Sequence, residues 1–143
     1  MNLVINLEQY NSNNVYFSSP INNKIMNDSN FLKVYYSSTK FVLNGIYLYI
    51  PLTIYQNNAN MYIFNYDLNH KIIERLREIE NDILVRVGIT NKERDYCLYN
   101  KFISGKINVY SKKYENVFDK IVIKISGIWE NSCSYGLNFK ICV

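Results

Sequence analysis

The stretch KIVIKISGIWENSCSYGLNFKICV, residues 120–143, decides the fold. It contains two runs in which apolar side chains alternate with polar ones, and a polar break at 130–134 separates the runs. Side chains of a β-strand point alternately to the two faces of a sheet, so each run predicts a strand with one apolar face. The polar break favours a turn, and the segment therefore predicts a β-hairpin. Gly127 and Gly136 interrupt the runs, where glycine usually marks a bulge or a close backbone approach.

The same alternation occurs in three segments further upstream. Residues 31–43 are rich in β-branched and aromatic side chains, and Asn44-Gly45 after them is a strong turn signal. Residues 46–55, IYLYIPLTIY, place aliphatic side chains on one face and mostly tyrosines on the other. Residues 60–66, NMYIFNY, predict a further strand with a second aromatic row. The aliphatic faces predict the core, and the aromatic rows lie either on the surface or under a second layer.

One segment has a different period. Between Leu68 and Val87 the apolar residues recur every three or four positions, which is the spacing of a helix. Charged residues of both signs occupy the other side, so the segment predicts an amphipathic scaffold helix rather than a basic recognition helix. Asp67 or Asn69 is expected to cap its start, and Gly88 is expected to end it.

After the helix, a charged connection covers 90–99 and alternation resumes over 101–114, with a bulge expected at Gly105. The order of the elements predicts a mainly β fold with one amphipathic helix. We expect an antiparallel barrel or sheet of five to seven strands, similar in order to an oligonucleotide-binding (OB) fold, although other small α+β sheets share that order. We expect a single β-rich domain over residues 31–143 and an N-terminal arm over residues 1–30.

Composition restricts the class of protein. The chain has 143 residues and a net charge of +4, and the excess of basic side chains falls after residue 90. No apolar run approaches the ~20 residues that a transmembrane helix needs, and the start has no secretory pattern. The three cysteines, Cys97, Cys133 and Cys142, form no CxxC pair, so they predict reduced thiols in a cytoplasmic protein and not a zinc site.

Few residues suit catalysis or metal binding. His70 is the only histidine, and it is expected at the surface near the helix start. Glu74, Glu78 and Asp82 recur at a spacing of four along the helix, but the interleaved arginines favour salt bridges over a metal site. The sequence has no glycine-rich phosphate loop. It therefore predicts a protein that is not an enzyme, with no catalytic residue, no metal and no cofactor.

The aromatic rows and the late lysines favour single-stranded nucleic acid as the ligand. Bases stack on aromatic rings, worth ~1–3 kcal/mol per base, while lysines contact phosphates. The predicted contact residues are Tyr47, Tyr49, Tyr55, Tyr62, Phe64, Tyr66, Lys101, Lys106, Tyr110, Lys112, Lys113, Lys124 and Lys140. Further candidates are Tyr35, Tyr36 and Trp129, of which Trp129 is favoured as a buried residue. Aromatic rows on strands are also common in cross-strand packing, so a core role for them is the alternative.

The ending IKISGIWENSCSYGLNFKI, residues 123–141, resembles a C-terminal segment of small proteins from large DNA viruses and related cytoplasmic elements. With its tyrosine–lysine strands and its abundance of residues with AT-rich codons, the chain resembles the small single-stranded DNA-binding proteins of such elements. The resemblance implies an OB barrel that coats single strands during DNA replication in the host cytoplasm. The apolar and basic ending LNFKICV departs from the acidic tails common in replication proteins, so recruitment of partner enzymes would differ.

A second class of protein fits the same residues. The alternative is a small structural or assembly subunit, such as a virion component or a part of a polymerase complex, whose aromatic faces are buried against protein partners, because tyrosine is also enriched at protein interfaces. The expected partners are single-stranded DNA or RNA in the first case. In the second case they are copies of the chain itself or replication and virion proteins, and neither case involves a membrane. Salt-sensitive binding to oligonucleotides distinguishes the two classes.

Overall fold

The computed structural model describes residues 3–22, 29–58, 61–108 and 121–142, with the backbone alone for 55–58. The strands in these ranges are β1 (Ile5–Asn6), β2 (Val15–Phe17), β3 (Ile21–Asn22), β4 (Asn30–Ser37), β5 (Val42–Asn44), β6 (Ile46–Ile50), β7 (Ile54–Asn58), β8 (Met61–Phe64), β9 (Glu93–Asp95), β10 (Lys106–Asn108), β11 (Ile121–Glu130) and β12 (Ser134–Cys142). The helices are α1 (Tyr66–Arg86) and α2 (Cys97–Ile103), and 3₁₀ turns cover Leu7–Gln9 and Ser12–Asn14.

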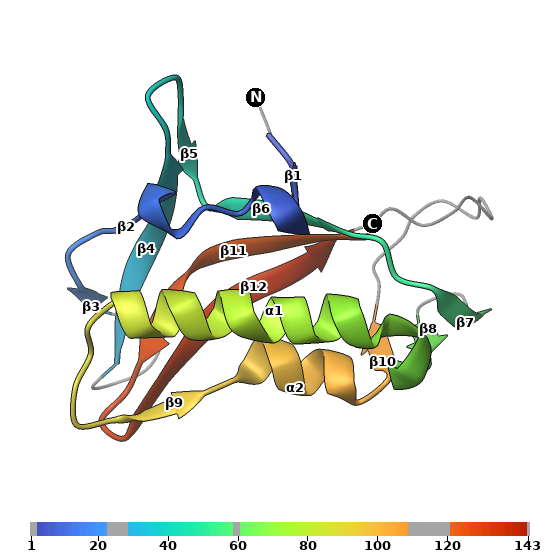
Figure 1. The fold of residues 1–143 in the computed structure, drawn as a ribbon. Helices are drawn as coiled ribbons and strands as arrows, with labels where there is room; N and C mark the ends of the chain where they lie inside the picture. The colour runs from blue at the N-terminus through green and yellow to red at the C-terminus, as the bar shows by residue number, and fades with distance from the viewer. Residues whose placement is uncertain (1–2, 23–28, 59–60, 109–120, 143) are drawn as a thin grey trace.

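The main sheet is organised around β11. In the described residues this sheet has nine strands, and β11 pairs antiparallel with β12, β4 and β6. β1 pairs parallel with β6, β9 pairs parallel with β12, and β2, β3 and β5 each pair with β4. A second sheet, of three described strands, has the order β10-β8-β7. Figure 1 shows α1 lying across β11 and β12, with α2 beside it.

The predicted hairpin, helix and core are confirmed. β11 and β12 form the hairpin, and their register shifts between Ile125 and Gly127, where a bulge was predicted. α1 covers most of the predicted segment, although Asn65 caps its start by accepting a hydrogen bond from the Asp67 N–H at 2.7 Å. The core residues with no exposed surface include Ile46, Leu48, Ile50, Ile73, Leu76, Ile79, Ile121, Ile123 and Ile125. No helix in the described ranges has the length and apolar character needed to cross a bilayer.

The predicted barrel is wrong for the described residues. They form an open mixed sheet with more strands than the five to seven expected. The strand pairing accounts for the additional strands. The short strands β1 and β9 add to the sheet in parallel, and β2 and β3 add to β4, so residues before 31 contribute strands to the main sheet.

Two predicted strands are each divided. The segment 31–43 forms β4 and then β5, which folds back on β4. Asn44-Gly45 does not close a hairpin, because β5 pairs with β4 whereas β6 pairs with β11. Gly45 has a φ of +107°, and a Cβ there would lie 3.0 Å from the Ile125 carbonyl oxygen, so this corner requires glycine. Pro51 has no N–H for the ladder and ends β6, and the chain then enters the second sheet as β7.

The segment after α1 contains a helix that the sequence pattern did not predict. Residues 97–103 form α2, where a charged connection and the start of a strand were expected. Leu98 and Phe102 are spaced by four and are both fully buried, as a helix face requires. Gly105 has a φ of +77° just beyond the helix and is not a strand bulge, and within the described residues the strand that follows it, β10, covers Lys106–Asn108.

Glu80 joins the two helices. Its side chain is completely buried, and its two carboxylate oxygens accept the N–H groups of Leu98 at 2.8 Å and Tyr99 at 2.9 Å. These are first-turn N–H groups of α2, which have no partner within their own helix. Burial raises the pKa of Glu80 to about 7, against the lowering effect of the two N–H groups. A carboxylate from α1 thus takes the place of a local cap for α2.

This burial predicts a pH dependence of stability. Because the folded state holds the Glu80 proton more tightly than the unfolded chain, the stabilisation from protonation is fully present below pH 4.5 and is lost as the pH rises towards 7. We expect the free energy of unfolding to fall by about 2 kcal/mol between pH 5 and pH 7 from this group alone. Urea unfolding of wild type and Glu80→Gln across this range isolates the contribution. Parallel pH profiles of the two proteins would contradict the assignment.

Candidate functional site

The main sheet has a face that points away from the helices. Because the aliphatic side chains of β6 and β11 are buried on the helix side, the alternate residues of each strand lie on the opposite side, which we call the outer face. Its residues are Phe31, Lys33 and Tyr35 of β4, Tyr47 and Tyr49 of β6, Val122, Lys124, Ser126 and Trp129 of β11, and Asn138, Lys140 and Cys142 of β12. Two of the predicted tyrosines and two of the predicted lysines therefore share one surface.

A row of Tyr47, Lys124 and Lys140 crosses the outer face. Tyr47 pairs with Lys124 in the register of β6 and β11, and Lys124 pairs with Lys140 in the register of β11 and β12. The Lys124 Nζ lies 5.5 Å from the centre of the Tyr47 ring, which is a cation–π contact. Lys140 is exposed, and two like charges directly opposite each other are unfavourable in a sheet. The row therefore favours an anion that neutralises both lysines.

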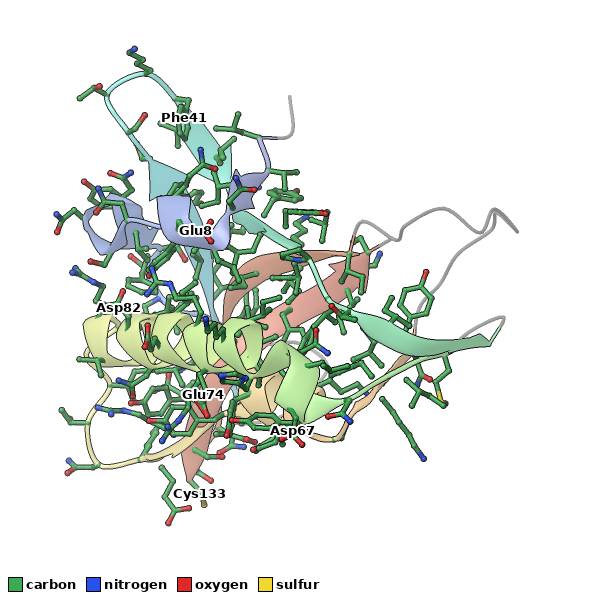
Figure 2. All side chains as sticks on the ribbon, turned by 45° about the vertical axis from the view of Figure 1, so that its right-hand side comes forward. Glu8, Phe41, Asp67, Glu74, Asp82 and Cys133 are labelled. Carbon is green, nitrogen blue, oxygen red and sulfur yellow. The ribbon has the colours of Figure 1, made fainter. Side chains whose placement is uncertain are left out.

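The two sides of the sheet differ in their acidic side chains. On the helix side, Asp67, Glu74 and Asp82 lie along α1 (Figure 2), where arginines are interleaved with the carboxylates. Among the described strand residues of the outer face, acidic side chains occur only on the edge strand β9, where Glu93 and Asp95 flank Arg94. Arg94 itself donates to the Tyr135 hydroxyl at 2.8 Å, on the helix side. An anion approaching β6, β11 and β12 thus meets lysines first.

The second predicted aromatic row is not on this surface. Tyr62 and Phe64 are 3% and 4% exposed, and the Phe64 ring packs 6.0 Å from that of Phe102 on α2. They belong to the core because β8 lies in the second sheet, next to α2. Tyr66 is the first residue of α1 and not a strand residue, and its hydroxyl donates to Glu74 at 2.9 Å. None of the three offers a ring on the outer face.

The remaining predicted residues lie elsewhere. Lys101 is exposed on α2 and Lys106 is exposed on β10, so neither joins the row of Tyr47, Lys124 and Lys140. Tyr110, Lys112 and Lys113 lie outside the described residues, as does the side chain of Tyr55. Among the further candidates, Tyr36 is 3% exposed and belongs to the core.

Two outer-face residues were missed from the sequence. Phe31 and Lys33 lie on β4 in phase with Tyr35, and Lys33 is exposed opposite Gly127. The alternation in FLKVYYS contained the signal, because residues spaced by two share a face. The excess of basic side chains after residue 90 favours the late lysines, and the pairing of β4 with β11 cannot be read from the sequence.

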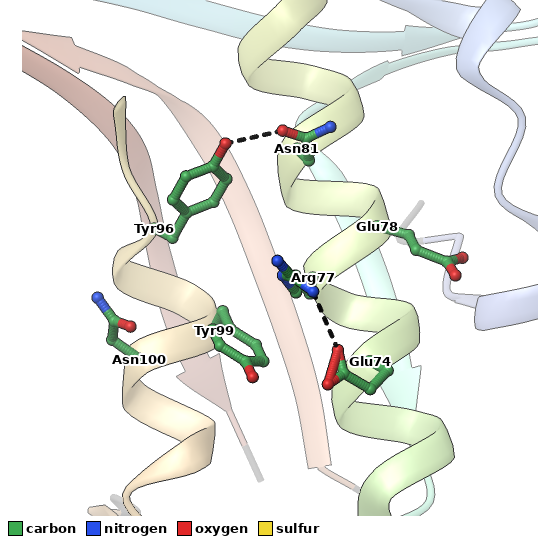
Figure 3. A pocket seen from close by; sticks show the side chains of 7 residues that line it. All are labelled: Glu74, Arg77, Glu78, Asn81, Tyr96, Tyr99 and Asn100. Carbon is green, nitrogen blue, oxygen red and sulfur yellow. Dashed lines mark hydrogen bonds and ion pairs between the residues drawn. The ribbon is translucent and has the colours of Figure 1, made fainter. Parts of the chain in front are cut away.

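A groove between α1 and α2 is a second candidate, with a volume of about 540 Å³ (Figure 3). Its polar side chains contact one another. The Tyr96 hydroxyl donates to Asn81 at 2.8 Å, and Arg77 lies 3.8 Å from the Glu74 carboxylate and 5.5 Å from the centre of the Tyr99 ring. These contacts tie the two helices together, so the groove resembles a packing seam more than a ligand site. The described residues hold no group of three or more His, Cys, Asp or Glu that could bind a metal.

The fold and the outer face define a mixed α/β protein with a large open sheet, covered by helices on one side and carrying aromatic rings and lysines on the other. No family model matches the chain, and neither the curated proteins nor the solved structures give a match.

Proposed function

We propose that the outer face binds single-stranded nucleic acid through aromatic rings and lysines. The observation that carries the proposal is the row of Tyr47, Lys124 and Lys140, with a cation–π contact at one end and an exposed ammonium group at the other. Single strands expose both phosphates and the faces of bases, which ammonium groups and aromatic rings bind without sequence preference. A duplex hides its base faces within the stack, so it engages only the lysines.

The resemblance of residues 123–141 implies the same function on a different fold. We propose that the protein coats single strands during viral DNA replication in the host cytoplasm. An open sheet replaces the closed OB barrel as the binding surface. No catalytic step, metal or cofactor is part of this function.

A titration tests the function. Fluorescence anisotropy of a labelled poly-dT oligonucleotide of about 30 nucleotides is measured at low and moderate salt, with a duplex of equal length as control. We expect binding that prefers the single strand and weakens steeply with salt. Absence of binding at low salt would refute the proposal.

The row predicts the effect of two lysine substitutions. Lys124→Gln and Lys140→Gln are each expected to reduce the slope of log K against log salt by roughly 0.7, because each removes one phosphate contact of a single strand. The matched control is Lys71→Gln, since Lys71 is exposed on α1 and lies on the helix side. If Lys71→Gln reduced the slope as much as the two sheet variants, the assignment of the row would be wrong.

A protein-assembly role is the second candidate, and exposed apolar side chains on the short strands favour it. Tyr16, Ile21 and Val42 are 55%, 46% and 72% exposed, and they lie on β2, β3 and β5, which all pair with β4. Such side chains at one end of a sheet suit contact with another protein. Light scattering distinguishes this role: a salt-insensitive oligomer that does not bind poly-dT supports assembly instead of nucleic-acid binding.

A further inference from the structure

Two aromatic rings on the outer face lie over glycines of the neighbouring strands. Phe31 of β4 pairs with Trp129 of β11, and Trp129 pairs with Gly136 of β12. A Cβ added to Gly136 would lie 2.8 Å from Cζ2 of Trp129, and a Cβ added to Gly127 would overlap Cζ of Phe31. Each ring thus occupies the space that a side chain on the neighbouring strand would fill. Because Gly127 and Gly136 have no Cβ atom, both rings can pack directly against the backbone of the sheet.

Contacts at the edge of the sheet hold the indole in place. The Cys97 thiol at the start of α2 lies beside the Trp129 ring and donates to the Leu137 carbonyl oxygen at 3.6 Å. The Cys97 Sγ lies 2.9 Å from the Cβ position of Gly136, on the same patch as the ring. An indole fixed by its strand, by the glycine beneath it and by a thiol loses little conformational freedom when it stacks against a ligand.

The charges around the two rings favour one path for a single strand of nucleic acid across the outer face. Lys33 follows Phe31 by two residues on the same face and is exposed, and Lys124 and Lys140 lie on the side of the rings away from β9. On the other side, Glu93 and Asp95 of β9 repel phosphates. A bound strand that stacks on the rings is therefore drawn towards the lysines and away from β9.

We propose that Phe31 and Trp129 form the base-stacking platform of the outer face, and that the sugar–phosphate backbone of a single strand runs from Lys33 towards Lys124 and Lys140. This inference rests on the proposed function and adds to it the residues that bind bases. It also assigns different roles to the rings. The Tyr47 ring contacts the Lys124 ammonium group, whereas Phe31 and Trp129 lie against glycines and are the rings that we propose to stack on bases.

The chain offers a direct reporter, because Trp129 is its single tryptophan. Unlabelled poly-dT is titrated into the wild-type protein while Trp129 emission is recorded, and the anisotropy of labelled poly-dT is measured in parallel. We expect quenching of the emission with the same midpoint as the anisotropy change. Trp129→Leu and Phe31→Leu keep apolar cover over the glycines without an aromatic face, and each is expected to weaken binding by roughly 5- to 100-fold. Tyr99→Leu, on α2, is the control and should bind as wild type does.

The outcomes separate the platform from the proposed function. Binding by anisotropy with unchanged Trp129 emission and unchanged affinity of the two leucine variants would overturn the platform and leave the lysine row in place. No binding of poly-dT by the wild-type protein would overturn both. Near-ultraviolet and far-ultraviolet circular dichroism confirms that each variant is folded before its affinity is compared.

Discussion

Glu80→Ala is expected to lower the free energy of unfolding by about 3 to 4 kcal/mol at neutral pH. The carboxylate accepts the N–H groups of Leu98 at 2.8 Å and Tyr99 at 2.9 Å, and Glu80 has no exposed surface. Alanine leaves both N–H groups buried without an acceptor and opens a cavity between α1 and α2. Both effects weaken the contact between α1 and the start of α2, so α2 is expected to detach from α1 before the main sheet unfolds.

Chemical denaturation of the variant measures the loss, and the tryptophan reports it because the Trp129 ring lies next to Cys97 of α2, with Cζ2 2.8 Å and Sγ 2.9 Å from the same Cβ position of Gly136. Glu78→Ala is the matched control. The Glu78 side chain is 67% exposed and forms a surface ion pair with Arg75 at 3.0 Å, so its loss is expected to cost less than about 1 kcal/mol. Similar losses for the two variants would show that Glu80 does not hold α2 in place.

Gly127→Ala is expected to destabilise the fold by about 3 kcal/mol. A Cβ at this position would overlap the Leu32 carbonyl oxygen and the Phe31 ring, and a backbone oxygen cannot move aside without shifting β4 against β11. These two strands pair directly at Gly127 and Lys33, so the substitution disturbs the centre of the main sheet.

Gly88→Ala is the control for this second prediction. Gly88 has a φ of +74° and nothing within 4 Å of its Cβ position, so alanine there meets only the strain of the left-handed backbone, about 1 to 2 kcal/mol. Thermal unfolding of both variants gives the comparison. A loss at Gly127 no larger than that at Gly88 would contradict the close packing of Phe31 over β11.

The parts of the fold predicted correctly carry strong local signals. Apolar and polar side chains alternate in both runs of 120–143. In α1, which has 21 residues, apolar side chains recur at helical spacing among charged ones. α2 has no such signal. It has only seven residues, and the acceptor of its first N–H groups is Glu80, which is remote in the sequence. A helix capped from a distance cannot be recognised by a local capping residue.

The candidate site was predicted in part, for a related reason. The IYLYI pattern placed Tyr47 and Tyr49 opposite the core correctly, because alternation fixes faces within one strand. It could not show that β8 enters a second sheet, which buries Tyr62 and Phe64. The partnership of Phe31 with Trp129 depends on the pairing of β4 with β11, and these strands are far apart in the sequence.

The most direct test of the binding face is a heteronuclear NMR titration of the labelled protein with poly-dT. We expect the largest changes in amide chemical shift on β4, β6, β11 and β12, with Lys33, Lys124 and Trp129 among them, and unchanged amide shifts on α1. Shifts gathered on α1 and α2 around the groove of Arg77 and Tyr99, or no shifts at low salt, would contradict the proposed binding face.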